Sequence, residues 1–349
     1  GQQDDSHNDW TYETGSAQKL SRDAIMLAVK SIVVDRMSIA RVAANLGVAW
    51  NTASDAILAA GTELLIDTPD RLDGVTIVGV DEHAWRHTRH GDKYVTVIID
   101  LTPTRTRTGP SRLLAVVEGR SKQAFKTWLE AQTDSFRNRV EIVAMDGFTG
   151  YKSAAVEAID TVTTVMDPYH VVALVGDKLD RCRQRIQQET LGHRGRSGDP
   201  LYGIRRVART RASLLTEKQQ HRLAKVLADE RHVAFEVTWS IYQDVIDAYQ
   251  APDPAEGKKI MTRVIDAIKA GVPAGLDELR SLGQTMKRRR DDILAFFDHP
   301  GTSNGPTEAI NGLLEHLRGT ARGFRSIVNY VARCLLDAGG FRPLIHSLL

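Results

Sequence analysis

Residues 21–65 carry apolar residues at helical spacing. They recur at intervals of three and four from Ile39 to Leu46, stop at Gly47, and recur again from Thr52 to Ile57. A helix, a short turn containing glycine and a second helix beginning near Ala49 form the pattern of a helix-turn-helix unit. The alternative is a plain helical hairpin packed against its neighbours.

The period becomes strand-like after a linker at residues 69–74. Residues 75–81, 93–100 and 112–117 are rich in β-branched side chains, and turn residues separate the three runs. This order predicts an antiparallel meander. Ser121 then stands where a helix would need an N-terminal cap.

Two further strands alternate with helices. Residues 140–146 end on an aspartate, a helical pattern covers about 149–159, and the strand at 162–166 runs into Asp167. Helical patterns then dominate from Val171 to about Phe297. The sequence thus predicts an α/β domain followed by a long helical insertion.

Composition is that of an ordinary globular protein. The chain has 349 residues, 42% of them hydrophobic and 26% charged, enough for two or three domains. No apolar run approaches the roughly 20 residues of a membrane helix, and no secretory signal is visible, so we expect a cytoplasmic protein without a membrane partner. The two isolated cysteines argue against a disulfide framework. Residues 1–17 are polar and predict a flexible lead-in.

The formal net charge is only +2, but the basic residues are clustered. Arginines are frequent from Arg181 to Arg211. A second cluster consists of Lys287, Arg288, Arg289 and Arg290. Both clusters could bind a phosphate backbone, and the alternative for each is a solvated helix face.

Three acids are candidates for chemistry. Asp81 and Asp146 each end a strand-like run, and Glu308 begins a helical pattern. An apolar run that stops on a carboxylate places it at the edge of a sheet. Three such carboxylates suit Mg²⁺ or Mn²⁺, and two ions roughly 4 Å apart can drive an in-line displacement at phosphorus. Taken singly, Asp146 could instead cap a helix, and Glu308 could simply be a favoured first-turn residue.

Other polar residues have less specific signals. Glu82 should point to the opposite face of its strand from Asp81, and Asp100 should lie at the opposite edge of the sheet. Asp167 could support the acids from a neighbouring strand, and His170 could reach a phosphate or cap a helix. From the first helical pair, the residues expected to contact DNA are Arg41, Trp50, Asn51, Thr52 and Ser54.

The order of elements, three strands, helix, strand, helix, strand and helix, resembles an RNase H-like domain of the retroviral-integrase type. Residues 80–85, 145–151, 167–172 and 303–312 stand in the order seen in transposases of the ISL-three insertion-sequence family. Residues 317–325 are also similar to the C-terminal segment of that family. The resemblance covers most of the chain. Family members usually begin with a Cys-rich zinc-binding segment, which these residues do not supply.

The resemblance implies a DDE transposase in which Asp81, Asp146 and Glu308 hold two Mg²⁺ or Mn²⁺ ions. Its partners would be double-stranded DNA, at transposon ends and target, and a second copy of the chain on paired ends, in the bacterial cytoplasm near the nucleoid. The alternatives are a transposase-derived DNA-binding protein without catalysis and a metal-dependent nuclease without strand transfer. The expected domains are a helix-turn-helix at 18–68, an RNase H-like core at 73–175 and 300–349, and an all-α insertion at 176–299.

Overall fold

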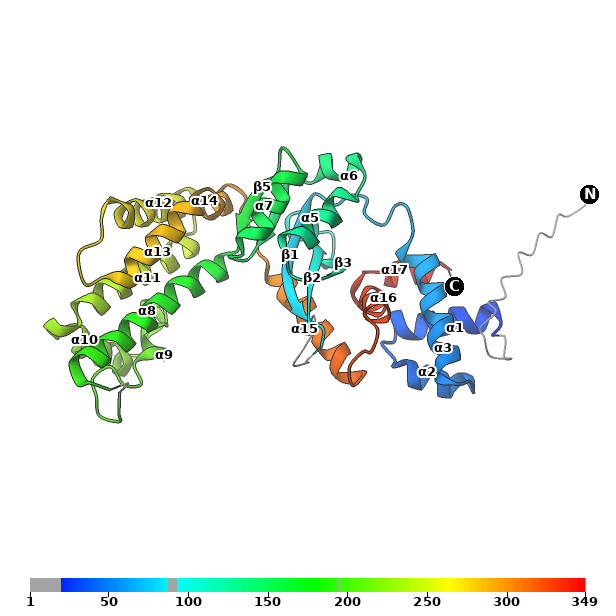
Figure 1. Cartoon of the computed structure of the whole chain (residues 1–349), viewed down its shortest axis with the longest axis horizontal. Helices are drawn as coiled ribbons and strands as arrows, with labels where there is room; N and C mark the ends of the chain where they lie inside the picture. The colour runs from blue at the N-terminus through cyan, green and yellow to red at the C-terminus, as the bar shows by residue number, and fades with distance from the viewer. Residues whose placement is uncertain (1–19, 87–92, 194, 349) are drawn as a thin grey trace, which may run out of the picture. The chain divides into compact units, whose positions relative to one another are not determined.

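The computed structural model describes residues 20–86, 93–193 and 195–348, so the expected lead-in at 1–17 lies outside the described residues. The chain divides into two compact units. The first contains the described residues up to Val143, residues 149–162 and everything from Asn304. The second contains residues 144–148 and 163–303. Figure 1 labels the elements of both units.

Three helices begin the first unit. Their bounds are α1 Arg22–Val33, α2 Ile39–Leu46 and α3 Trp50–Gly61. The Ser38 hydroxyl caps α2 by accepting a hydrogen bond from the Arg41 N–H. Gly47 ends α2 at φ 66°, a left-handed conformation that glycine adopts without strain. The predicted pair of helices with a glycine turn is confirmed, and α3 continues into the π-helical turn η1, Thr62–Ile66.

A mixed five-stranded sheet has the strand order β3-β2-β1-β4-β5. The strands are β1 Ile77–Ala84, β2 Tyr94–Asp100, β3 Arg112–Glu118, β4 Ile142–Met145 and β5 Thr163–Met166. Strands β1, β2 and β3 pair antiparallel, which confirms the predicted meander. The first strand was expected to end at Asp81, and this is wrong. Pairing with β2 continues to Ala84, so Asp81 lies within β1, opposite Val97.

The helices of the first unit pack on this sheet and on α3. Helix α5 lies beside α7, where the buried Phe125 ring meets the Tyr151 ring edge-on at 5.8 Å between centroids. Helix α16 packs against both β3 and α3, and α15 packs against β1 (Figure 1). Ser121 caps α5 as predicted. The bounds are α4 Thr102–Thr106, α5 Lys122–Glu130, α6 Asp134–Arg139, α7 Thr149–Ala158, α15 Gly305–Thr320, α16 Ile327–Ala338 and α17 Arg342–Leu348.

The second unit contains β5 and the end of β4, and from α8 onward it is a helical bundle, as the sequence predicts after Val171. Helix α11 packs between α8 and α12, and α14 covers β5. The apolar core runs through α8 and α11–α14. No helix in the described part of the chain is long and apolar enough to cross a membrane. The bounds are α8 Pro168–Leu191, α9 Arg205–Ala208, η2 Ala212–Leu214, α10 Glu217–Leu227, η3 Glu230–His232, α11 Val233–Gln250, α12 Pro254–Ala270, α13 Asp277–Arg288 and α14 Arg290–Asp298.

Candidate active site

The Asp81 carboxylate is half-buried on β1 and is held by hydrogen bonds on both oxygens. Its Oδ1 accepts from the Glu82 N–H at 2.8 Å. Its Oδ2 accepts from Asn311 Nδ2 at 3.0 Å. Since Asn311 lies on α15, this bond ties that helix directly to the carboxylate. Sequence reasoning missed Asn311, because a single asparagine in a helical pattern carries no local signal.

The start of α15 also lies unusually close to β1. Asn304 Nδ2 donates to the Val80 carbonyl at 3.3 Å. A Cβ atom on Gly79 would stand 2.7 Å from Leu101 Cδ1 and 2.9 Å from both Asn304 Oδ1 and Thr307 Oγ1. Such distances are below van der Waals contact. The absence of a side chain at Gly79 therefore allows α15 to approach this strand.

Glu308 lies in the first turn of α15 and is exposed. A carboxylate in this position is favoured by the positive end of the helix dipole. Glu308 and Asn311 are three residues apart, so they share one face of the helix. Glu308 is therefore on the side of α15 from which Asn311 bonds to Asp81.

Asp146 belongs to the second unit and directly follows β4. Its Oδ1 accepts from the Phe148 N–H at 2.8 Å. Arg289 stabilises this turn, because its Nη1 donates to the Gly147 carbonyl at 3.1 Å. Arg289 also forms an ion pair with Asp292, with 2.6 Å between Nε and Oδ2.

The Arg289–Asp292 pair is buried, with Arg289 2% exposed and Asp292 1% exposed. The other Asp292 oxygen accepts from the Thr164 hydroxyl on β5 at 2.6 Å. We expected Arg289 to contact DNA, and this is wrong. It lies between α13 and α14, three residues after Met286 and four before Ile293, which are both fully buried. That spacing was the signal in the sequence that separates Arg289 from its basic neighbours.

Asp167 is 2% exposed and caps α8. It accepts from the Tyr169 and His170 N–H groups, and Ser303 Oγ donates to its other oxygen at 3.2 Å. Its own N–H donates to the Met145 carbonyl, the last residue of β4. Asp167 thus steadies the strand end that leads to Asp146. The His170 ring meets the Tyr169 ring edge-on at 5.6 Å.

The residues expected to contact DNA from the first helices divide into two groups. Thr52 and Ser54 are buried, at 3% and 2% exposed, and of the two only Ser54 lines a surface groove beside α3. Thr52 is therefore not placed to contact DNA, which corrects the expectation for that residue. Trp50 is 50% exposed, and the remaining two expected contacts are also exposed: Arg41 and Asn51.

The basic clusters of the second unit differ in how far their charges are balanced. Lys287 and Arg288 are exposed, and Arg290 Nη2 lies 3.9 Å from Asp266 Oδ2. In the longer cluster, ion pairs within the unit balance much of the charge. These pairs are Arg183–Asp180, Arg185–Glu278, Arg205–Asp180, Arg209–Asp177 and Arg211–Asp247.

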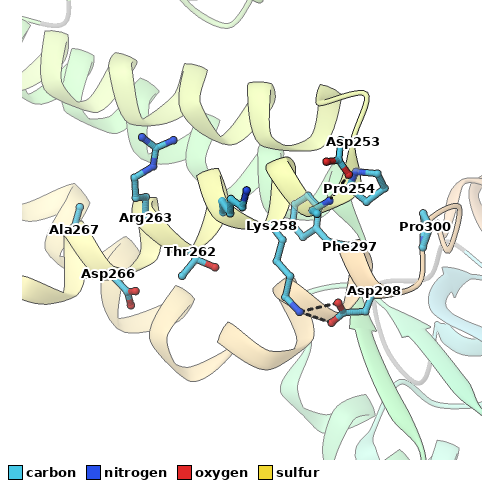
Figure 2. Close-up of a pocket in the computed structure, with 12 residues that line it drawn as sticks. Asp253, Pro254, Lys258, Thr262, Arg263, Asp266, Ala267, Phe297, Asp298 and Pro300 are labelled. Atoms are coloured by element: carbon cyan, nitrogen blue, oxygen red, sulfur yellow. Dashed lines mark hydrogen bonds and ion pairs between the residues drawn. The ribbon is translucent and has the colours of Figure 1, made fainter.

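A surface hollow of about 1010 Å³ lies along α12 and the end of α14 (Figure 2). Lys258 crosses it and donates to both Asp298 oxygens, at 2.7 and 2.6 Å. Phe297 packs against Gly257, where a Cβ atom would meet the ring at 2.8 Å. The hollow thus contains the Lys258–Asp298 ion pair and a contact between α12 and α14. The residues that line it do not form a catalytic set.

A family model for transposases, that of the DDE transposases of ISL-three elements, matches residues 78–334, which is more than half of the chain. The chain belongs to this transposase family. The matched span contains Asp81, Asp146 and Glu308, and the resemblance seen in the sequence is confirmed. No curated protein matches the chain.

Membership makes the chain a DNA transposase of the nucleotidyl-transferase type. DDE transposases generally use divalent metal ions. Within the described residues, no group of three histidine, cysteine, aspartate or glutamate side chains is gathered so that it could hold a metal ion. The structure ties Asp81 to the helix of Glu308 in the first unit, and it holds Asp146 in the second.

Proposed function

We propose that this transposase binds the terminal inverted repeats of its insertion sequence and performs metal-dependent strand cleavage and strand transfer. The observation that carries the proposal is the bond from Asn311 to Asp81, which ties the helix bearing Glu308 to the strand bearing the first acid. Asp146 would complete the set. The acids belong to segments far apart in the sequence, and all of them lie in the span that the family shares.

The three side chains fit the proposed ions chemically. Carboxylate oxygens are the ligands that Mg²⁺ and Mn²⁺ prefer, and all three of the proposed side chains are carboxylates. Two bound ions would activate the attacking hydroxyl and stabilise the leaving oxygen. The chain's own groups orient the carboxylates: Asn311 and the Glu82 N–H for Asp81, and the Phe148 N–H for Asp146.

The remaining parts would serve DNA. We propose that α2 and α3 act as a helix-turn-helix unit, with Arg41, Trp50 and Asn51 exposed toward the inverted repeat. Lys287 and Arg288 would contact the backbone from the helical insertion. The sheet and its helices would form the RNase H-like core. A homodimer on paired ends, in the bacterial cytoplasm at the nucleoid, is the proposed working form.

Charge-neutral substitutions test the catalytic set. Asp81→Asn, Asp146→Asn and Glu308→Gln should each abolish cleavage of an inverted-repeat duplex while leaving its binding intact. Glu315→Gln is the matched control, since Glu315 is an exposed acid on the same helix, ion-paired to Arg318. Full activity in any one of the three variants would remove that acid from the site.

A second assay separates the proposal from its alternatives. A pre-cut end with a free 3′-hydroxyl should be joined to target DNA by the wild-type protein. Cleavage without joining would indicate a nuclease. Tight binding with neither reaction, in Mg²⁺ or Mn²⁺, would indicate a DNA-binding protein that has lost catalysis.

A further inference from the structure

A groove of about 890 Å³ lies within the first unit, between the α2–α3 pair and the C-terminal end of α15. We name it the α3–α15 groove. One wall holds Trp50 and Asn51 from the start of α3. The opposite wall is the segment from Thr320 to Ser326 that follows α15, and α16 closes the floor.

The groove is strongly basic. Arg36, Arg322 and Arg325 line it and are exposed, and Arg333 lies in its floor. Asp337 is its acidic lining residue. A surface with this excess of guanidinium groups attracts a polyanion, because each contact with a phosphate releases a condensed counterion.

Arg333 is the most unusual of these arginines, since it is only 4% exposed. Its Nη2 donates to the Met37 carbonyl at 3.2 Å. Its Nη1 is buried and has no hydrogen-bond partner among the residues that the structure describes. Burial lowers the pKa of its guanidinium, and Asp337 partly opposes this. A buried guanidinium nitrogen without an acceptor is costly, and an anion bound in the groove would offset part of this cost through its charge.

Two arginines of the groove have an uncommon backbone conformation. Among the described residues, three that are not glycine have positive φ: Arg36 at 53°, Arg107 at 56° and Arg322 at 56°. Two of the three line this groove. A left-handed conformation is costly for arginine compared with glycine or asparagine, and such strain gathers at functional sites. Arg36 and Arg322 thus place their charges at the groove at some cost in backbone free energy, as Arg107 does outside it.

We propose that the α3–α15 groove binds the sugar–phosphate backbone of double-stranded DNA, with Arg36, Arg322 and Arg325 as phosphate contacts and Arg333 as a buried positive charge beneath them. This rests on the proposed function, because it takes DNA as the partner. The exposed start of α3 would face the bases beside this backbone contact. Since α15 also carries Glu308, DNA bound in the groove would contact the same helix that carries a proposed catalytic acid.

The test uses substitutions that remove charge without adding backbone strain. Asparagine tolerates positive φ, so Arg36→Asn and Arg322→Asn should keep or raise the melting temperature. Arg107→Asn is the matched control, since Arg107 has the same conformation and exposure but does not line the groove. Binding to an inverted-repeat duplex and to a random duplex is measured by fluorescence anisotropy at several salt concentrations.

We expect each groove variant to lose roughly fivefold in affinity near 0.15 M salt and to flatten the salt slope by about one, for both duplexes. Arg107→Asn should match the wild type. If Arg36→Asn and Arg322→Asn bind both duplexes as the wild type does, the groove is not a DNA site. Loss of self-association without loss of DNA binding would also overturn the proposal and point to a second copy as the occupant.

Failure of this inference can be told apart from failure of the proposed function. Wild-type protein that binds neither duplex, or Asp81→Asn protein that still cleaves, would count against the proposed function. Normal DNA binding by the groove variants, with cleavage that still depends on Asp81, would remove only the groove.

Discussion

Replacing Arg289 with methionine removes one half of a buried ion pair. Arg289 Nε lies 2.6 Å from Asp292 Oδ2, and the two side chains are 3% and 2% exposed. The substitution leaves the Asp292 carboxylate buried, where its Oδ1 still accepts from the Thr164 hydroxyl. It also removes the donors to the carbonyls of Gly147 and Asp146.

Removing one partner of such a pair costs about 3–5 kcal/mol, because the remaining charge stays buried. We expect Arg289→Met to lower the free energy of unfolding by this amount. Replacing both partners, as Arg289→Met with Asp292→Leu, should recover most of the loss, since an apolar pair of similar volume is often neutral. Arg288→Met is the control, because Arg288 is exposed, and it should stay within about 0.5 kcal/mol of the wild type.

The assay is urea unfolding followed by circular dichroism, with hydrogen exchange at residues 144–148. The double variant separates stability from positioning. It should fold well but still cleave DNA poorly, because the carbonyls beside Asp146 have lost their donors. Arg289→Met protein as stable as the Arg288→Met control would refute the reasoning. So would a double variant with full cleavage activity.

Three further predictions concern the α15 contact and the cysteines. Gly79→Ala should lower the free energy of unfolding, measured by thermal unfolding, by about 1–3 kcal/mol and reduce cleavage, because its Cβ atom would displace α15. Gly312→Ala is the control: Gly312 lies on α15 with open space around it, so this change should be neutral or stabilising. Asn311→Ala should lower the rate constant for cleavage at saturating DNA and leave the dissociation constant unchanged, and weaker binding would contradict its role. Burial raises the pKa of Cys182 to about 11 and that of Cys334 to about 12, so both thiols should stay protonated at pH 8 and react with a thiol reagent only after unfolding; rapid labelling of native protein would contradict this.

Local signals predicted much of the secondary structure. The glycine turn at Gly47, the cap at Ser121 and the alternation of β-branched residues are visible within a few positions, and the corresponding helices and strands are present. The end of β1 was missed for the opposite reason. Its extension beyond Asp81 depends on pairing with β2, which no local pattern encodes.

The side chains that surround the acids could not be predicted from short stretches of sequence. The contacts of Asn304 with Val80, and of Asn311 with Asp81, join residues more than two hundred positions apart in the sequence. Gly79 owes its importance to the same approach of α15. Arg289 was wrongly predicted to contact DNA because its neighbours are basic, although its spacing from the apolar Met286 indicates burial.

The most direct test of the central claim is cleavage of an end-labelled inverted-repeat duplex in Mg²⁺ by Asp146→Asn, measured beside Asp160→Asn. Asp146 is the acid that the second unit contributes, and Asp160 is an exposed aspartate outside the proposed set. The account predicts that Asp146→Asn binds the duplex normally and produces no detectable cleavage, while Asp160→Asn cleaves as the wild type does. Cleavage by Asp146→Asn at the wild-type rate would contradict it.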